Sequence, residues 1–327
     1  MNPTISILIP TYNAAEVVSN CIKSALSLPY QDIEIIVGND GSTDHTEEVI
    51  NRYSDERLRK YSNKENLGHD KNVLKIAEMA SGDYIFFTSD EDLIHPTGFE
   101  RIYQLATNPI DTSVIFGNIL DAREGDADYY YKRDEEFWLT PDKAIRAFAS
   151  DLKGTPGWWG HSYITGTVIK AENIDFPFLQ DYIGCGYMAS ALAANALLQG
   201  GLYWINDPVA IITPARADRV PKTKSNNEMI SSYSTEARYE QIKYRLQFAE
   251  ECNLNEELYE FIRTKEKQYT ANVLFKKYRY DIISILDELD QTILDKEEFI
   301  KLSGGMWLRA QINKPRRALG MISYSSR

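Results

Sequence analysis

Residues 84–96 read YIFFTSDEDLIHP. An apolar, aromatic run that is typical of a buried strand ends directly in three acids, Asp90, Glu91 and Asp92. Like charges at a buried strand end repel one another, so solvent, a basic side chain or a metal ion must neutralise them. One interpretation is a solvated acidic turn before a helix that begins near Pro96. The other is a site for Mg²⁺ or Mn²⁺, which take oxygen ligands and leave positions for phosphates.

The segments before this stretch alternate between strand and helix patterns. The strand-like runs are TISILIPTY, DIEIIVGND, RLRKYSN and DYIFFTS, and the helix-like runs between them are AEVVSNCIKSALSL, GSTDHTEEVINRYS and HDKNVLKIAEMASG. This alternation over residues 1–95 predicts an α/β fold with a mostly parallel sheet flanked by helices. Ligands of such sheets bind at the carboxyl ends of the strands, where the three acids lie.

The rest of the chain divides into three parts. SVIFGNILDA, YITGTVIKA and LYWINDPVAIIT read as strands, and TPDKAIRAFASDL and YMASALAANALLQ read as helices. ARADRVPKTKSNN is basic and unpatterned, and the pattern is helical from about residue 231 onward. We therefore predict an α/β domain at 1–215, a basic loop or linker at 216–230 and a C-terminal helical region at 231–327.

The composition is that of a globular protein, with 327 residues of which 43% are hydrophobic and 26% are charged. The net charge of −12 argues against a nucleic-acid-binding surface. Cys21, Cys185 and Cys252 lack metal-ligand spacing, which favours a reduced compartment. The N-terminus lacks the basic segment of a signal peptide, and the uncharged run 187–206 is broken by polar residues and glycines. We expect a cytoplasmic protein.

A second constellation joins the ends of the first two strands. Asn13 and Asp40 offer side-chain donors and acceptors there, while Thr11 and Tyr12 offer main-chain groups. Gly41 allows a close turn around a flat ligand, and an Asp beside a base can accept a hydrogen bond from a ring N–H. The alternative is an ordinary strand-to-helix turn with a helix cap.

Together these motifs resemble one family. SILIPTYN, IIVGNDGSTD, NLG followed by Asn72, and DYIFFTSDEDLIHP occur in the order found in the family-2 glycosyltransferases of the GT-A fold, which use nucleotide-diphospho-sugars. The resemblance covers about the first 100 residues. The stretch GHDKNVLKIAEMASGDYIFFTSDED is most similar to the bacterial branch that includes abequosyltransferases of surface polysaccharides.

The resemblance implies an inverting, metal-dependent transferase. Residues 1–95 would form its nucleotide-sugar-binding half and residues 96–215 its acceptor-binding half. The donor nucleotide would be UDP in the commonest case, with CDP or GDP as alternatives. The acceptor would be a glycan or a lipid-linked glycan in bacterial surface polysaccharide biosynthesis.

The resemblance also assigns roles to residues. Asp90, Glu91 and Asp92 match the motif that holds Mg²⁺ or Mn²⁺ and the diphosphate. The nucleotide-sugar is expected to contact Thr11, Tyr12, Asn13, Asp40, Asn72, Asp90 and Glu91.

Three positions depart from the family pattern. Asn39 stands where many members have an Asp, and Ser89 stands where the commoner motif begins with an Asp. Glu91 replaces a middle Asp, and its extra methylene moves the carboxylate. Which of the three acids holds the metal therefore stays open, and a nucleotide-sugar-binding paralogue or assembly subunit without transfer activity is the alternative function.

An inverting transfer needs a carboxylate that removes the proton of the acceptor hydroxyl. Family members usually place it in a Glu-Asp pair at a helix start. The matching region is FPFLQDYIGCGYMASALAANALL, where Asp181 is the single acid, so we predict Asp181 as the base. The alternative is a turn residue; Asp175, just before this region, is the next candidate.

Two loops carry further candidates. Trp158 and Trp159 can stack against an acceptor sugar and His161 can donate to it, or the tryptophans are packing anchors. Arg216 and Arg219 can close over a diphosphate, or they belong to a solvated linker.

The C-terminal tail 301–327 carries basic and apolar side chains and no acids. This combination suggests contact with an anionic membrane surface, which would place the protein peripherally at the inner face of the membrane. The alternative is a terminal helix that packs on its own domain.

Overall fold

The computed structural model describes residues 4–108, 111–123, 128–150, 165–214, 222–225, 228–231, 243–244, 246–252, 254–264 and 267. The chain divides into two compact units, residues 1–241 and residues 242–327. The described residues of the second unit are helical at 243–244, 246–251, 256–264 and 267.

The strands of the first unit are β1 (Ile5–Thr11), β2 (Ile33–Asn39), β3 (Leu58–Ser62), β4 (Tyr84–Phe87), β5 (Leu93–Ile94), β6 (Thr112–Asp121), β7 (Asp128–Tyr131), β8 (Phe137–Leu139), β9 (Thr167–Lys170), β10 (Gly201–Ile212), β11 (Lys222–Ser225) and β12 (Glu228–Ser231). Its α-helices are α1 (Val18–Leu26), α2 (Thr46–Asn51), α3 (His69–Glu78), α4 (Pro96–Thr107), α5 (Pro141–Ser150), α6 (Phe176–Leu179) and α7 (Met188–Leu197). Two 3₁₀ turns are η1 (Ala171–Asn173) and η2 (Gln180–Tyr182).

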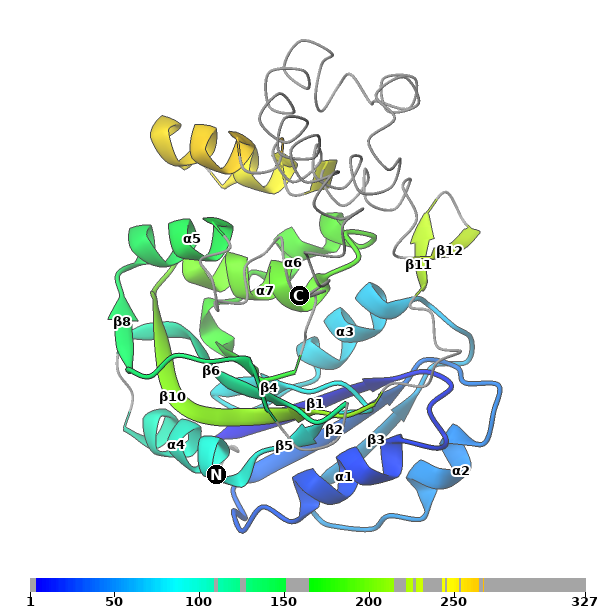
Figure 1. The fold of residues 1–327 in the computed structure, drawn as a ribbon. Helices are drawn as coiled ribbons and strands as arrows, with labels where there is room; N and C mark the ends of the chain where they lie inside the picture. Colours follow the sequence, from blue (N-terminus) through cyan, green and yellow to red (C-terminus); the bar gives the residue numbers. More distant parts are fainter. Residues whose placement is uncertain are drawn as a thin grey trace, which may run out of the picture. The chain divides into compact units, whose positions relative to one another are not determined.

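A ten-stranded sheet organises the first unit (Figure 1), in the order β3-β2-β1-β4-β9-β6-β10-β5, with β7 paired to β6 and β8 paired to β10. The four strands of the N-terminal half, β3, β2, β1 and β4, are mutually parallel. In the second half, β6 and β10 are parallel, whereas β9 runs antiparallel between β4 and β6. The predicted α/β class is confirmed, and the antiparallel pairings enter after residue 92.

The centre of this sheet is buried on both faces. Every residue of β1 and β2 is buried, with α1 and α2 on one face and α3 on the other (Figure 1). A parallel strand covered on both faces is mostly apolar along its length, rather than alternating between apolar and polar residues. This explains the apolar runs within ISILIPT of β1 and YIFF of β4, which is also fully buried.

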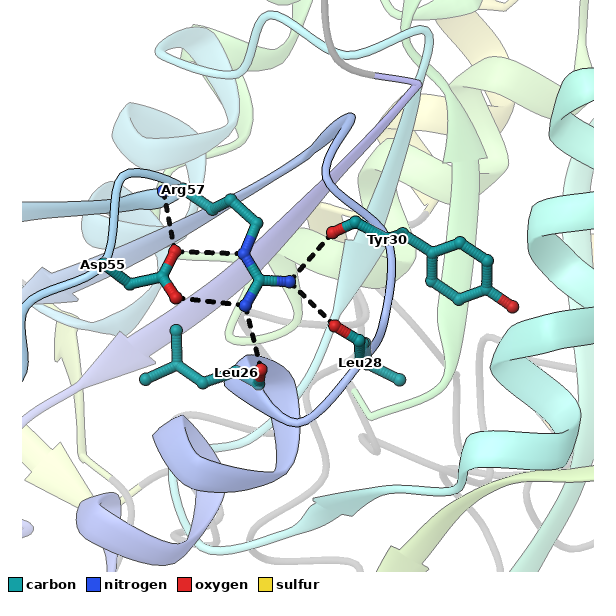
Figure 2. A network of polar contacts seen from close by, with 5 residues as sticks. All are labelled: Leu26, Leu28, Tyr30, Asp55 and Arg57. Carbon is teal, nitrogen blue, oxygen red and sulfur yellow. Dashed lines mark hydrogen bonds and ion pairs between the residues drawn. The ribbon is translucent and has the colours of Figure 1, made fainter.

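The C-terminal end of α1 is fastened by Arg57, which lies just before β3 (Figure 2). Its guanidinium donates to the main-chain oxygens of Leu26, Leu28 and Tyr30 at 2.8–2.9 Å. The remaining donors bind both carboxylate oxygens of Asp55, at 3.0 and 3.1 Å. Carbonyl groups at a helix end lack partners within the helix, and a cation there also suits the helix dipole. All five N–H groups of this buried guanidinium are therefore used.

Several elements differ from the expectations. β5, β7, β8 and α6 are short elements that the sequence pattern did not reveal. Part of the predicted loop 216–230 forms the antiparallel pair β11–β12. The run 187–206 forms a helix, a turn and a strand, as predicted, and within the described residues no helix is long and apolar enough to cross a membrane. The tail 301–327 lies outside the described residues, so its membrane contact stays a prediction.

Candidate functional site

The carboxyl ends of β1, β2 and β4 bring the predicted site residues to one edge of the sheet. Thr11 at the end of β1 pairs with Asn39 at the end of β2, and the Asp40 amide donates to the Thr11 oxygen at 2.8 Å. The Thr88 amide, just after β4, donates to the Leu8 oxygen of β1. The first turn, the second turn and the acidic motif therefore start side by side, as the alternating pattern predicted.

Thr11 and Asp90 make a direct contact. The Thr11 hydroxyl donates to Asp90 Oδ2 at 2.6 Å across 79 residues of sequence. Both side chains are buried, with 2% and 1% of their surface exposed. The hydrogen bond thus joins the first turn to the acidic motif inside the protein.

Asn13 ties the first turn to the second. Its φ is 49°, and among the described non-glycine residues it alone has a positive φ. Its side-chain oxygen accepts from the Thr43 amide at 2.8 Å, and its own amide donates to Ser42 Oγ at 2.9 Å. Asn tolerates the left-handed region better than most residues. Tyr12, between Thr11 and Asn13 in the sequence, is half-buried.

Asp40 is buried and heavily hydrogen-bonded. Its Oδ1 accepts from Asn63 Nδ2 and the Leu67 amide, both at 2.9 Å, and its Oδ2 accepts from the Gly68 amide at 3.0 Å. Burial raises the pKa of Asp40, although these hydrogen bonds oppose the rise. Because a carboxylate offers about four acceptor positions, these three donors leave room for one further donor, such as a base N–H.

Asn72 lies behind Asp40 in the same network. It is 2% exposed, donates to the Gly38 oxygen at 2.8 Å and accepts from Asn63 at 3.2 Å. Asn63 thus bridges Asp40 and Asn72. The structure places Asn72 where it supports the loop around Asp40, and its predicted contact with the nucleotide-sugar stays a prediction.

Asp92 faces the second half of the sheet. Its Oδ2 accepts from the Thr165 hydroxyl at 2.6 Å, and its Oδ1 accepts from the Thr213 amide at 3.2 Å. Burial raises the pKa of Asp92 to about 7, and the neighbouring charges of Glu91 and Asp90 add to the rise. Asp92 therefore joins the acidic motif to the residues before β9 and after β10.

Glu91 is half-buried between the two aspartates, and its main-chain oxygen accepts from the Thr213 hydroxyl at 2.6 Å. In the part of the chain that the structure describes, no group of three or more His, Cys, Asp or Glu side chains converges as a metal site. The three acids of the motif thus do not form a preassembled cluster of three carboxylates. Asp90 and Asp92 are both buried, and carboxylate oxygens are the kind of ligand that Mg²⁺ and Mn²⁺ prefer.

The remaining predicted residues have mixed positions. Asp181 is exposed on η2, which directly follows α6, and Asp175 caps α6 by accepting from the Phe178 amide at 3.1 Å. Asn39, which stands where many members of the resembling family have an Asp, accepts a hydrogen bond from the Ser42 amide at 3.2 Å. This contact is typical of a turn residue. Outside the described residues lie Trp158, Trp159, His161, Arg216 and Arg219.

Sequence reasoning missed several residues that hold this edge together. Asn63, Thr165 and Thr213 each hydrogen-bond an acid of the site. Asp70, in the first turn of α3, accepts hydrogen bonds from residues more than 110 positions away. Their roles depend on distant partners, and Asp70 looked like an ordinary first-turn acid of a helix.

Comparison with known proteins points to one family. Residues 6–164 match the family model described as glycosyl transferase family 2. Glycosyltransferase GlyG of Streptococcus pneumoniae serotype 4 is 31% identical over 177 residues, which are 53% of this chain and 58% of the relative. A GalNAc(5)-diNAcBac-PP-undecaprenol beta-1,3-glucosyltransferase of Campylobacter jejuni is 29% identical over 126 residues, 38% of this chain and 40% of the relative. The chain spans about half the length of the curated relatives it matches.

Solved structures share the fold. Staphylococcus aureus TarS 1–349 in complex with UDP-GlcNAc has a TM-score of 0.57 and 14% identity, covering 98% of this chain and 84% of that chain. The mannosyltransferase PcManGT of Pyrobaculum calidifontis, in complex with GDP-Man and Mn²⁺, has a TM-score of 0.51 and 15% identity, with the same coverage. The predicted resemblance to the family-2 glycosyltransferases is thereby confirmed over residues 6–164, and the chain shares the fold of these solved structures.

Proposed function

We propose that this protein is an inverting, metal-dependent glycosyltransferase. It moves a sugar from a nucleotide-diphospho-sugar to a glycan or lipid-linked glycan acceptor in bacterial surface polysaccharide biosynthesis. The observation that carries the proposal is the buried hydrogen bond between Thr11 and Asp90, beside Asp40, at the carboxyl edge of the sheet. Buried acids gathered where parallel strands end are costly for stability, and a charged ligand gives a reason for them.

The donor nucleotide would lie against Asp40 and the turn Thr11–Asn13. Asp40 has acceptor capacity left for a base N–H, and Asn13 fixes the turn that approaches it. The solved structures of related fold hold UDP-GlcNAc or GDP-Man, which supports UDP as the first expectation and GDP as an alternative. CDP stays an alternative that the sequence resemblance alone implies.

Asp90 and Asp92 would hold Mg²⁺ or Mn²⁺. Glu91 is the further candidate ligand, and the diphosphate and water would complete the coordination, as is usual for magnesium sites. When bound, the cation supplies Lewis-acid stabilisation of the leaving diphosphate. A cation would also favour the charged form of Asp92, whose pKa is raised by burial and, to a smaller extent, by the charges of Glu91 and Asp90.

Asp181 is the proposed base. Its carboxylate would take the proton of the acceptor hydroxyl while the oxygen bonds to the anomeric carbon and the bond from that carbon to the diphosphate breaks. The exposure of Asp181 on η2 leaves it accessible to an acceptor. The name of the Campylobacter relative refers to an undecaprenol-linked glycan, which supports a lipid-linked acceptor.

The proposal is tested with Asp90→Asn and Asp92→Asn. We expect each variant to lose transfer by roughly 100-fold or more while the fold survives, because stabilisation of the developing charge is lost. The measurement is release of nucleotide diphosphate from UDP-GlcNAc and GDP-Man with a bacterial lipid-linked glycan extract, together with calorimetric binding of UDP, GDP and CDP with and without Mn²⁺.

The matched control is Asp32→Asn, which removes an exposed carboxylate just before β2, at the amino ends of the parallel strands and away from the proposed site. This variant should keep full activity. Unchanged transfer in both site variants, or full activity of the wild type in EDTA, would refute the metal assignment. Metal-dependent nucleotide binding without turnover on any acceptor would indicate the non-catalytic binding protein instead.

A further inference from the structure

Asp70 carries a set of contacts that the proposed function does not yet explain. This first-turn residue of α3 is 4% exposed. Its Oδ2 accepts from the Gly186 amide at 2.6 Å and the Gly184 amide at 3.1 Å, and its Oδ1 accepts from the Met188 amide at 3.2 Å. The half-exposed ring of His69 lies 3.5 Å from Oδ1. One buried carboxylate therefore gathers three main-chain N–H groups from a single distant segment.

These contacts cap α7 from another helix. The first amides of a helix have no partner within it, and Tyr187 at the cap position of α7 makes no side-chain capping bond. Asp70 accepts from Met188, the first residue of α7, and from Gly186 just before it. Its negative charge also suits the positive end of the helix dipole.

The segment 184–188 is shaped to fit Asp70. Gly184 and Gly186 have φ values of 110° and 76°, in the left-handed region that favours glycine. These two conformations turn alternate amides toward the same carboxylate. The segment follows η2, which carries Asp181, after the single residue Ile183.

The residues just before Asp70 contact Asp40, the buried acid at the proposed nucleotide site. The amides of Leu67 and Gly68, two and three residues before Asp70, donate to the Asp40 carboxylate. A stretch of four residues thus joins the buried acid at the proposed nucleotide site to the buried acid that holds segment 184–188. The donor half and the acceptor half of the domain are linked through hydrogen bonds at both ends of this stretch.

We propose that Asp70 is a positioning residue for sugar transfer. It fixes segment 184–188, and with it the proposed base Asp181, against the nucleotide-binding half. This inference rests on the proposed function. Asp70 does not act as the base itself, since it is buried and its oxygens already accept three N–H groups. It acts by holding main chain whose displacement would misalign the acceptor.

The test is Asp70→Asn, whose amide group replaces one acceptor oxygen with a donor that faces an N–H group. We expect kcat to fall on the order of 10- to 100-fold, because small misplacements of reacting groups cost that much. Calorimetric binding of UDP with Mn²⁺ should be unchanged. Hydrogen–deuterium exchange should show faster exchange of the amides at 184–188 than in the wild type.

The matched control is Glu34→Gln. Glu34 is also buried, at 7% exposed, and accepts from the Ser6 hydroxyl and the Ser81 amide, but it lies at the opposite edge of the sheet. Both variants should unfold at lower temperature, and only Asp70→Asn should lose kcat. Equal kcat in the two variants, or unchanged exchange at 184–188, would overturn the proposal.

The two proposals fail in different ways. If the wild type binds no nucleotide and transfers no sugar, the proposed function fails. The exchange comparison then still decides whether Asp70 holds segment 184–188. If the wild type transfers sugar and Asp70→Asn transfers it equally well, the proposed function stands and the positioning role of Asp70 is wrong.

Discussion

At the scale of single residues, identical side chains in one motif have different environments. Asp90 meets the Thr11 hydroxyl, whereas Asp92 meets Thr165 and Thr213. The sequence predicted that these acids gather where strands end, because strand polarity alone requires it. It did not predict the partner of each acid, since those partners lie 73 to 121 positions away.

The contact between Thr11 and Asp90 gives a prediction at this scale. Thr11→Val keeps the shape of the side chain but removes the hydroxyl that donates to a buried carboxylate. We expect the free energy of unfolding to fall by about 1–3 kcal/mol, because a hydrogen bond to a charged group is lost and its acceptor stays buried. Urea denaturation measures the change.

Thr11→Ser is the control, because it keeps the hydroxyl and removes only a methyl group. It should be closer to the wild type than Thr11→Val in the same experiment. If the valine variant is as stable as the serine variant, the hydroxyl contributes nothing and Asp90 does not depend on it.

At the scale of elements, the sequence revealed those strands whose burial makes them continuously apolar. β1, β2 and β4 were predicted for this reason, and the helices between them from their spacing. β5, β7 and β8 contain two to four residues each and arise from pairing with β6 and β10. A pattern that needs several repeats to be seen cannot reveal strands this short.

The end of α1 gives a prediction at the element scale. Arg57→Lys keeps the positive charge but replaces five fixed donors with three on a flexible stem. Carbonyl groups of Leu26, Leu28 and Tyr30 then lose partners around a side chain that is 10% exposed. We expect a loss of about 2–3 kcal/mol in the free energy of unfolding, measured by urea denaturation.

Arg52→Lys is the control for this change. Arg52 is exposed at the end of α2, and the same substitution there should leave stability nearly unchanged. A similar loss in both variants would mean that the effect belongs to arginine in general rather than to the network at α1.

At the scale of the whole molecule, two buried carboxylates at opposite ends of the parallel strands have pKa values that are shifted in opposite directions. At the amino edge, burial raises the pKa of Glu34, but hydrogen bonds from Ser6, Ser81 and Arg59 outweigh it and lower the pKa overall. At the carboxyl edge, burial and like charges raise the pKa of Asp92 to about 7. The charged form of Glu34 therefore stabilises the folded protein, whereas the charged form of Asp92 destabilises it.

This contrast predicts how stability depends on pH. A raised folded pKa means that the contribution of Asp92 is fully present below the unfolded pKa and is lost as the pH rises through about 7. In EDTA, the wild type should therefore lose about 2 kcal/mol of unfolding free energy between pH 5.5 and pH 8 relative to Asp92→Asn. The Asn amide can still accept from Thr213 and donate to Thr165, so the variant isolates the charge.

Glu34→Gln is the control, because the pKa of Glu34 is shifted in the opposite direction. Its lowered folded pKa stabilises the protein above the unfolded pKa, and this contribution is lost only as the pH falls through the folded value. Glu34→Gln should therefore be less stable than the wild type by the same amount at pH 5.5 and pH 8. Urea denaturation at the two pH values separates the cases. A pH-independent difference between the wild type and Asp92→Asn would show that the charge of Asp92 does not destabilise the fold.

Adding Mn²⁺ at pH 8 should stabilise the wild type more than Asp92→Asn. A cation that binds the folded state stabilises it, and the wild type has one more carboxylate to hold the cation.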